Sequence, residues 1–193
     1  MQVARSPSNS ATVSNNMVTP DYSLRRYASL KNVPLDDAKR ILLDHGELQL
    51  RRLVDAGGPW FDIHDHINAF WQGFDAYVPP NGSYYLAHRA SGEVVGTGAL
   101  KRVSETTAEM KHLYVKPDMR GSGLGTALVK QRIADAKEMG VKHLIADTIK
   151  FNSELPALYK KLGFRKVQTA ELSYSAHVTP ELSDFLFYFR MDL

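Results

Sequence analysis

Hydrophobic and polar residues alternate along this chain with the period of a strand in some segments and the period of a helix in others. The points at which the period changes predict where its first strands and helices begin and end. From Tyr22 the pattern is that of a strand (YSLRRYAS). A helix is predicted after Pro34, because two aspartates follow that suit the positive N-terminus of a helix. A second helix is predicted from Asp62 and ends before Pro79 and Pro80. Its apolar residues fall at helical spacing: Ile63, Ile67, Phe70, Trp71 and Phe74.

Three strands are predicted next, and helices and strands then alternate. Ser-Gly at 91–92 joins the first two strands as a hairpin, and a Gly-rich turn at 120–125 opens a helix that Gly140 ends. The predicted strands are 83–90, 93–103, 108–116, 143–149, 165–172 and 184–192, with a helix at 155–162.

This order predicts one α/β (α+β) domain on a mixed, mostly antiparallel sheet. About six or seven strands and four helices are expected, with a parallel pair where strand 108–116 crosses over to strand 143–149. A length of 193 residues favours one domain, and no internal linker divides residues 21–193. Residues 1–20 are rich in Ser, Asn, Thr and Pro without hydrophobic periodicity, which predicts a disordered tail.

Composition excludes several classes of function. The chain has no cysteine, which excludes thiol nucleophiles, iron–sulfur clusters and cysteine zinc sites. Its net charge of +3 is spread along the sequence, so no nucleic-acid partner is expected. No apolar run approaches the ~20 residues of a membrane helix, so no membrane association is expected. We expect a cytoplasmic protein; the alternative is a mitochondrial transit peptide in residues 1–20, which hold one Arg and no acid.

The most informative segment is AEMKHLYVKPDMRGSGLGTALV, residues 108–129. Glycines between a strand and a helix let the backbone approach a ligand closely, and the free N–H groups of the helix start suit a pyrophosphate. The Walker and Rossmann patterns both fail here. The pattern that fits is Arg-x-x-Gly-x-Gly at Arg120, Gly123 and Gly125. The alternative is a turn that only packs the helix on the sheet.

A second block lies downstream, and together the two blocks resemble a known family. Asn152 is followed by Tyr159 and by Gly163-Phe164 in the pattern N-x(6)-Y-x(3)-G-F. Both blocks, in this order, are similar to the signatures of the GCN5-related N-acetyltransferase (GNAT) superfamily. The resemblance covers residues 22–193 and is close over 108–164. One departure is Leu155-Pro156 where a small residue is frequent; proline is tolerated in a first helical turn.

The resemblance implies acetyl-CoA as co-substrate, and no metal is expected. Asn152 is also suited to cap a helix, and both roles are compatible. His64 and His66 do not suggest a metal site, because residues two apart on a helix point in different directions. His112, in the motif strand, is expected either to touch the site or to be structural. The cofactor-binding residues implied are Leu113, Tyr114, Val115, Arg120, Gly121, Ser122, Gly123, Leu124, Gly125, Thr126, Asn152 and Tyr159.

Three residues are expected to carry the chemistry. By resemblance Glu109 is the general base, acting through water; the alternative is a cross-strand ion pair with Lys or Arg. The backbone N–H of Leu113 is expected to bind the oxyanion from a β-bulge, against the alternative of a regular strand. Tyr159 is the candidate acid for the leaving thiolate, since a phenol has a pKa near ~10; the alternative is a packed core tyrosine.

The function predicted is an acetyl-CoA-dependent N-acetyltransferase acting on a primary amine of a small molecule or peptide. Without cysteine, direct attack in a ternary complex is expected. The alternative is a catalytically silent acyl-CoA-binding sensor or scaffold. In the family two segments usually line the acceptor site, here 55–62 and 170–184, and many members are homodimers, although nothing in this sequence fixes the oligomeric state. The candidate acceptor residues are Trp60, Phe61, Tyr174, Asp55, Asp62 and Glu171.

Overall fold

The computed structural model describes residues 21–168 and 180–193. They form one seven-stranded sheet in the order β1-β2-β3-β4-β5-β7-β6, in which every neighbouring pair is antiparallel except β4 and β5. The strands are β1 (Ser23–Tyr27), β2 (Gly82–His88), β3 (Val94–Arg102), β4 (Thr107–Val115), β5 (His143–Ile149), β6 (Arg165–Val167) and β7 (Leu186–Asp192).

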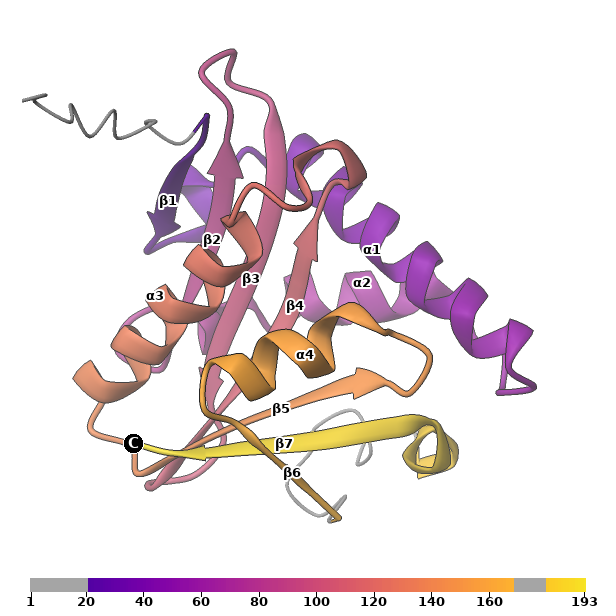
Figure 1. Ribbon diagram of the computed structural model, residues 1–193. Coiled ribbons are helices and arrows are strands. Elements are labelled where there is room, and N and C mark those ends of the chain that lie inside the picture. Colours follow the sequence, from indigo (N-terminus) through magenta and orange to yellow (C-terminus); the bar gives the residue numbers. More distant parts are fainter. Residues whose placement is uncertain (1–20, 169–179) are drawn as a thin grey trace, which may run out of the picture.

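Four α-helices within the described residues cover the two faces of this sheet (Figure 1). They are α1 (Leu35–Asp55), α2 (Ile63–Gln72), α3 (Leu124–Glu138) and α4 (Glu154–Lys161). Short 3₁₀ segments are η1 (Leu30–Asn32), η2 (Phe74–Tyr77), η3 (Pro117–Met119) and η4 (Pro180–Phe185). The predicted α/β class, the strand number, the helix number and the parallel pair are confirmed.

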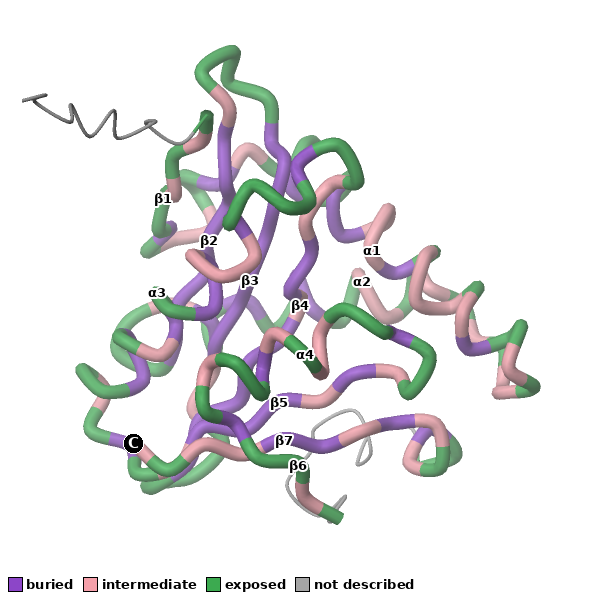
Figure 2. The backbone as a smooth tube through the Cα atoms, viewed as in Figure 1, coloured by how far each residue is buried: buried purple, intermediate pink, exposed green. Residues whose placement is uncertain are grey.

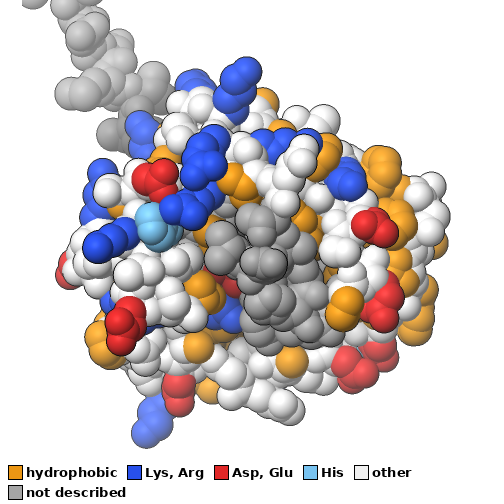
Figure 3. All heavy atoms as spheres, turned by 90° about the horizontal axis from the view of Figure 1, so that it is seen from below, with side chains coloured by type: hydrophobic (Ala, Val, Ile, Leu, Met, Phe, Trp, Pro, Cys, Tyr) orange, Lys and Arg blue, Asp and Glu red, His pale blue; other side chains and the backbone are white. Residues whose placement is uncertain are grey.

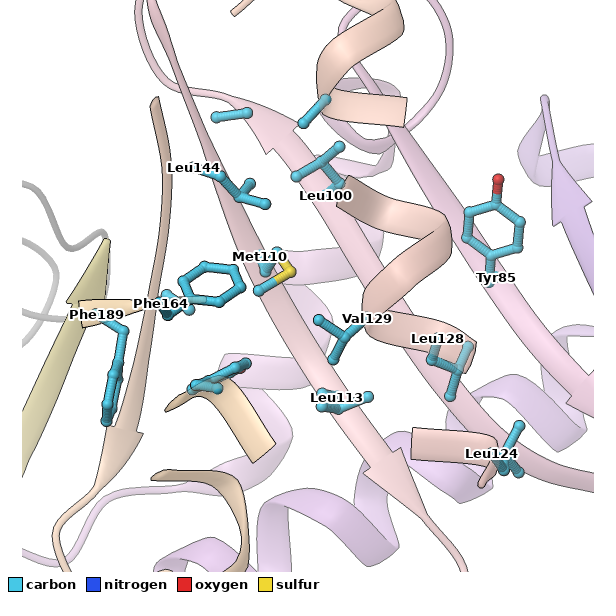
Figure 4. Close-up of a cluster of buried hydrophobic side chains, with 14 of the residues drawn as sticks. Tyr85, Leu100, Met110, Leu113, Leu124, Leu128, Val129, Leu144, Phe164 and Phe189 are labelled. Atoms are coloured by element: carbon cyan, nitrogen blue, oxygen red, sulfur yellow. The ribbon is translucent and has the colours of Figure 1, made fainter. Parts of the chain in front are cut away.

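Two hydrophobic cores sandwich the sheet, and the central strands are buried along most of their length (Figure 2). One core lies between the sheet and α3 and α4, where Met110 and Leu113 of β4 project toward Leu128 and Val129 of α3 (Figure 4). The other lies between the sheet and α1 and α2 and is rich in aromatic rings, with Phe70, Trp71 and Tyr84 among them. The side chains on the two faces of β4 therefore lie in different hydrophobic cores.

Several predicted elements have different ends in the structure; strand 165–172, for example, ends at Val167. The helix after Asp62 stops at Gln72 rather than near Pro79, because Gly73 ends it with an N–H bond to the Ala69 carbonyl and Phe74 starts a 3₁₀ turn. The last strand begins at Leu186 rather than at residue 184, since η4 takes up the residues before it. Asp62 caps α2 as predicted, its carboxylate accepting from the His64 N–H at 2.8 Å.

Candidate active site

The Gly-rich turn has the backbone conformation that its glycines allow. Gly121 and Gly123 have φ values of +80° and +86°, in the left-handed region that side chains with a Cβ rarely adopt. A Cβ added at either position would meet no atom within 4 Å. The turn therefore presents open backbone at the start of α3, whose first N–H groups lack partners within the helix.

A cavity of about 560 Å³ lies against this turn. Its walls come from the end of β4, the turn, the C-terminal half of α1 and α4. Three cations line it: Arg52, Arg120 and Lys161. The Arg120 guanidinium is fixed from both sides, since Nε donates to the Val115 carbonyl at 3.3 Å and Nη1 lies 3.5 Å from Glu154. The cavity thus combines backbone donors with positive charge, which suits a phosphate group.

Nine of the twelve predicted cofactor residues line this cavity: Leu113, Tyr114, Val115, Arg120, Gly121, Gly123, Gly125, Thr126 and Asn152. The side chains of Ser122 and Leu124 serve the fold, because the Ser122 hydroxyl donates to the Met119 carbonyl at 2.7 Å and Leu124 is completely buried. The third, Tyr159, lies on the neighbouring cavity. The Asn152 side chain caps α4, accepting from the N–H groups of Glu154 and Leu155 at 3.1 and 3.2 Å.

A β-bulge interrupts β4 immediately before Leu113. The register with β3 sets Tyr114 opposite Thr97 and Lys111 opposite Ala99, so that His112 and Leu113 share one partner position. His112 has a φ of +54°. Pairing of β4 with β5 ends at Met110, and the two strands diverge beyond it (Figure 1). The predicted bulge is confirmed, and a regular strand here is wrong.

A buried cation that the sequence analysis did not single out holds this bulge. Arg132 of α3 is 0% exposed, and its Nη1 donates to the carbonyls of Ala99 and Lys111, each at 3.2 Å. These carbonyls belong to the paired residues at the edge of the bulge. Burial lowers the pKa of Arg132 to about 10, so it stays protonated at neutral pH. The signal was a charged residue four positions after Leu128, on the apolar face of the helix.

A second, smaller cavity of about 150 Å³ lies beside the bulge. It shares Gln49, Leu113 and Leu155 with the first cavity, so the two meet at Leu113. Tyr159 lines it and packs against Phe164 and Phe189, with ring centroids 5.1 Å away in each case. Burial raises the pKa of Tyr159 to about 12. The phenol is therefore protonated over the whole physiological range.

Glu109 lies in a buried charge cluster rather than in the cavity wall. It is 0% exposed and its carboxylate is 3.6 Å from the Lys111 ammonium, which also lies 3.2 Å from Asp147. Burial alone would lower the pKa of Lys111, but attraction by Asp147 and Glu109 raises it overall. Lys111 and Asp147 line the smaller cavity, so an ion pair links Glu109 to that wall. This ion pair joins Glu109 to Lys111 of its own strand, whereas the alternative for Glu109 expected a cation on a neighbouring strand.

The other candidate residues are divided between this cavity and the surface. Phe61, His66 and His112 line the smaller cavity. Trp60 is 72% exposed and His64 is exposed, while Asp62 is used as the cap of α2. Glu171 and Tyr174 lie outside the described residues. Within the described ranges, no group of three or more His, Asp or Glu side chains could hold a metal ion.

Comparison with known proteins identifies the family. The sequence profile described as "Acetyltransferase (GNAT) family" matches residues 48–164, more than half of the chain. This chain belongs to the GNAT acetyltransferase family. The matched range includes β4, the Gly-rich turn and α4, which contribute to the cavity walls. It therefore also includes both sequence motifs that resemble the GNAT signatures.

Two curated relatives of this GNAT chain illustrate the range of the match. It is 32% identical over 112 residues to the uncharacterized N-acetyltransferase YjgM of Escherichia coli, covering 56% of this chain and 66% of that protein. It is 36% identical over 95 residues to an uncharacterized N-acetyltransferase of Schizosaccharomyces pombe, covering 48% of this chain and 57% of that protein. The matches thus span under two thirds of those relatives' own length.

Solved structures share the fold of this GNAT domain. An acetyltransferase from Streptococcus agalactiae superposes with a TM-score of 0.68 at 20% identity, over 91% of this chain and 100% of that one. A GNAT family acetyltransferase from Elizabethkingia anophelis with acetyl-CoA bound gives a TM-score of 0.60 at 20% identity, again over 91% and 100%. These likenesses support the fold alone.

Surface features bear on the expected partners. Of the helices that the structure describes, none is long and apolar enough to cross a membrane. On the face shown in Figure 3, Lys and Arg side chains lie mainly toward one side, whereas acidic side chains occur on both sides. That face therefore carries mixed charge.

Proposed function

We propose that this chain is an acetyl-CoA-dependent N-acetyltransferase that moves an acetyl group to a primary amine of a small molecule or peptide. The observation that carries the proposal is the meeting of two cavities at Leu113, one polar and cationic and the other mainly apolar. Two substrates that enter from separate sides can meet there, as direct attack in a ternary complex requires.

The larger cavity fits the co-substrate. The open backbone at Gly121 and Gly123 and the cations Arg120 and Lys161 would hold its pyrophosphate. Acetyl-CoA, when bound, supplies a thioester whose carbonyl carbon accepts the amine and whose thiolate leaves. Val115 and Asn152 also line this cavity and would contact the pantetheine arm.

The bulge gives Leu113 its part in the reaction. The register shift around His112 supports this role, in which the Leu113 N–H would donate to an oxygen on which negative charge develops. Tyr159, whose pKa burial raises to about 12, keeps its proton for the departing thiolate. Glu109 is the proton acceptor, with the Lys111–Asp147 pair and water linking it to the smaller cavity.

The test is CoA-thiol release from acetyl-CoA across a panel of primary amines, with the acetylated products identified by mass. At least one amine is expected to be acetylated. Tyr159→Phe should lower kcat by roughly 100-fold with the KM for acetyl-CoA unchanged. Glu109→Gln should lower kcat and shift its pH profile, whereas Glu93→Gln, which removes an exposed ion pair with Lys116, should do neither.

The silent binding module makes the opposite prediction. Acetyl-CoA binding without any acetylated amine would overturn the enzyme and leave the sensor or scaffold. If the Glu109→Gln variant loses stability but keeps the wild-type pH profile, the role of Glu109 is limited to its ion pair with Lys111.

A further inference from the structure

The smaller cavity has a mostly apolar wall whose composition restricts the amine. Ile63, Ile67 and Phe70 of α2 line one side, and Leu182 and Leu186 line another. A volume of about 150 Å³ is enough for one benzene-sized group. The cavity therefore selects for size and for apolar surface.

The charges in this wall already have partners. Asp147 is the one carboxylate among the described residues that line the cavity, and it is 3.2 Å from Lys111. Lys111 in turn lies 3.6 Å from Glu109. An incoming cation other than the reacting amine would thus have to compete with Lys111 for these carboxylates.

The rest of the polar part of the wall that the structure describes comes from three histidines and from Gln49, Thr148 and Tyr159, and it adds no charge at neutral pH. His45, His66 and His112 all line the cavity, and the ring of His112 lies 6.3 Å from that of His45 and 4.6 Å from that of Phe70. Burial lowers the pKa of His45 to about 4, that of His66 below its usual value and that of His112 well below it. Neutral imidazoles can hydrogen-bond an amine but offer no ionic partner to a second ammonium or to a carboxylate.

We infer that the acceptor is a primary monoamine carried on a compact apolar group, an aromatic ring or a short branched alkyl, without a second charge. The inference rests on the proposed function and deepens it. A distal ammonium would lose its hydration in the cavity without gaining, from the described wall, a carboxylate that Lys111 does not already hold, and burial of an unpaired charge is costly. The apolar group, in contrast, gains by leaving water.

A matched pair of ligands tests this on the full chain. Benzylamine and 4-(aminomethyl)benzylamine differ by one distal aminomethyl group, and the diamine has two reactive amines where benzylamine has one. Binding is measured by calorimetry in the presence of CoA, and turnover by thiol release from acetyl-CoA. Benzylamine is expected to bind at least tenfold more tightly and to react with at least tenfold higher kcat/KM.

A matched pair of variants tests the assignment of the wall. Ile63→Asp adds a carboxylate to the cavity wall in the first turn of α2, where helices tolerate acids. It should move the preference toward the diamine by about tenfold. Asn68→Asp adds the same charge to an exposed position of α2 outside the wall and should leave the preference unchanged.

The outcomes separate the inference from the function on which it rests. Preferential binding of benzylamine without acetylation would overturn the proposed function and support the amine class. Equal or tighter binding of the diamine, or no binding of benzylamine, would overturn the inference whether or not other amines react. An identical shift in Ile63→Asp and Asn68→Asp would overturn the role of the wall. If Ile63→Asp does not fold, His66→Asp on the same wall replaces it.

Discussion

The two cavities that meet at Leu113 are built in different ways. The larger one depends mainly on the stretch from Leu113 to Thr126, whose turn presents backbone, with α1 and α4 contributing to the rest of its wall. The smaller one depends on side chains that α1, α2, β4, β5 and η4 bring together from distant parts of the sequence. A co-substrate common to a family can be bound by a short motif, whereas an acceptor specific to one chain is recognised by dispersed residues.

The bulge lies between the two cavities. Substitution of Arg132 is the strongest test of whether turnover can be impaired without a loss of acetyl-CoA binding. Arg132→Met removes the donor shared by the Ala99 and Lys111 carbonyls. We expect kcat to fall roughly 100-fold, since a displacement of about 1 Å near the chemistry has that effect. The KM for acetyl-CoA should change little, because the Gly-rich turn is untouched.

Two further variants make this prediction specific. Lys130→Met removes a positive charge from an exposed position of α3 and should be silent. Gly98→Ala should reproduce part of the Arg132→Met effect, because its Cβ would lie 3.1 Å from the Arg132 guanidinium carbon. Parallel losses in kcat and in acetyl-CoA affinity would mean that the cavities do not act separately.

A glycine pair on α3 tests the larger cavity alone. Gly123 and Gly140 flank this helix with φ values of +86° and +71°, and a Cβ at either would meet nothing within 4 Å. Replacement by alanine strains each backbone by about 1–2 kcal/mol. Gly123→Ala should raise the KM for acetyl-CoA about tenfold, whereas Gly140→Ala should lower only the free energy of unfolding. Equal KM values in the two variants would contradict the role of the turn.

The smallest expected effect concerns the smaller cavity and pH. The pKa of His45 falls from 6.5 in the unfolded chain to about 4 in the folded one, so below pH 6.5 the unfolded state binds the proton first. Acidification from pH 7 to 5 should therefore lower the free energy of unfolding by about 2 kcal/mol through His45. Denaturant unfolding at both pH values should show this loss diminished in His45→Gln and retained in His64→Gln.

The sequence was sufficient for the fold and for the larger cavity because both depend on local signals. Strand and helix periods, turn glycines and the Arg120-x-x-Gly123-x-Gly125 spacing are contiguous in the chain. The predicted end of α2 at Pro79 and Pro80 is wrong because the helix already ends at Gln72, with Gly73 as its C-cap. Glycine alone ended the helix, since the hydrophobic pattern continued through Phe74 into a 3₁₀ turn.

The smaller cavity could not be predicted in the same way. His45 lies near the middle of α1, with no local pattern that connects it with His112 on β4, and only the packing of α1 on the sheet brings their rings to 6.3 Å. Glu109 was recognised by resemblance, but its pairing with Lys111 depends on which faces of β4 are buried. Acceptor residues proposed in 170–179 remain predictions.

Helix α3 also fixes the distance between the Gly-rich turn and the bulge. The turn at its N-terminus borders the larger cavity. Nine residues after Gly123, Arg132 donates a hydrogen bond to the Lys111 carbonyl at the bulge. At 1.5 Å per residue the helix fixes this interval at about 13 Å. One inserted residue between the two points would rotate Arg132 by about 100° away from β4 while leaving the turn intact. The number of residues between the turn and Arg132 therefore fixes how far a thioester anchored at the turn lies from the bulge, whichever side chains surround the thioester.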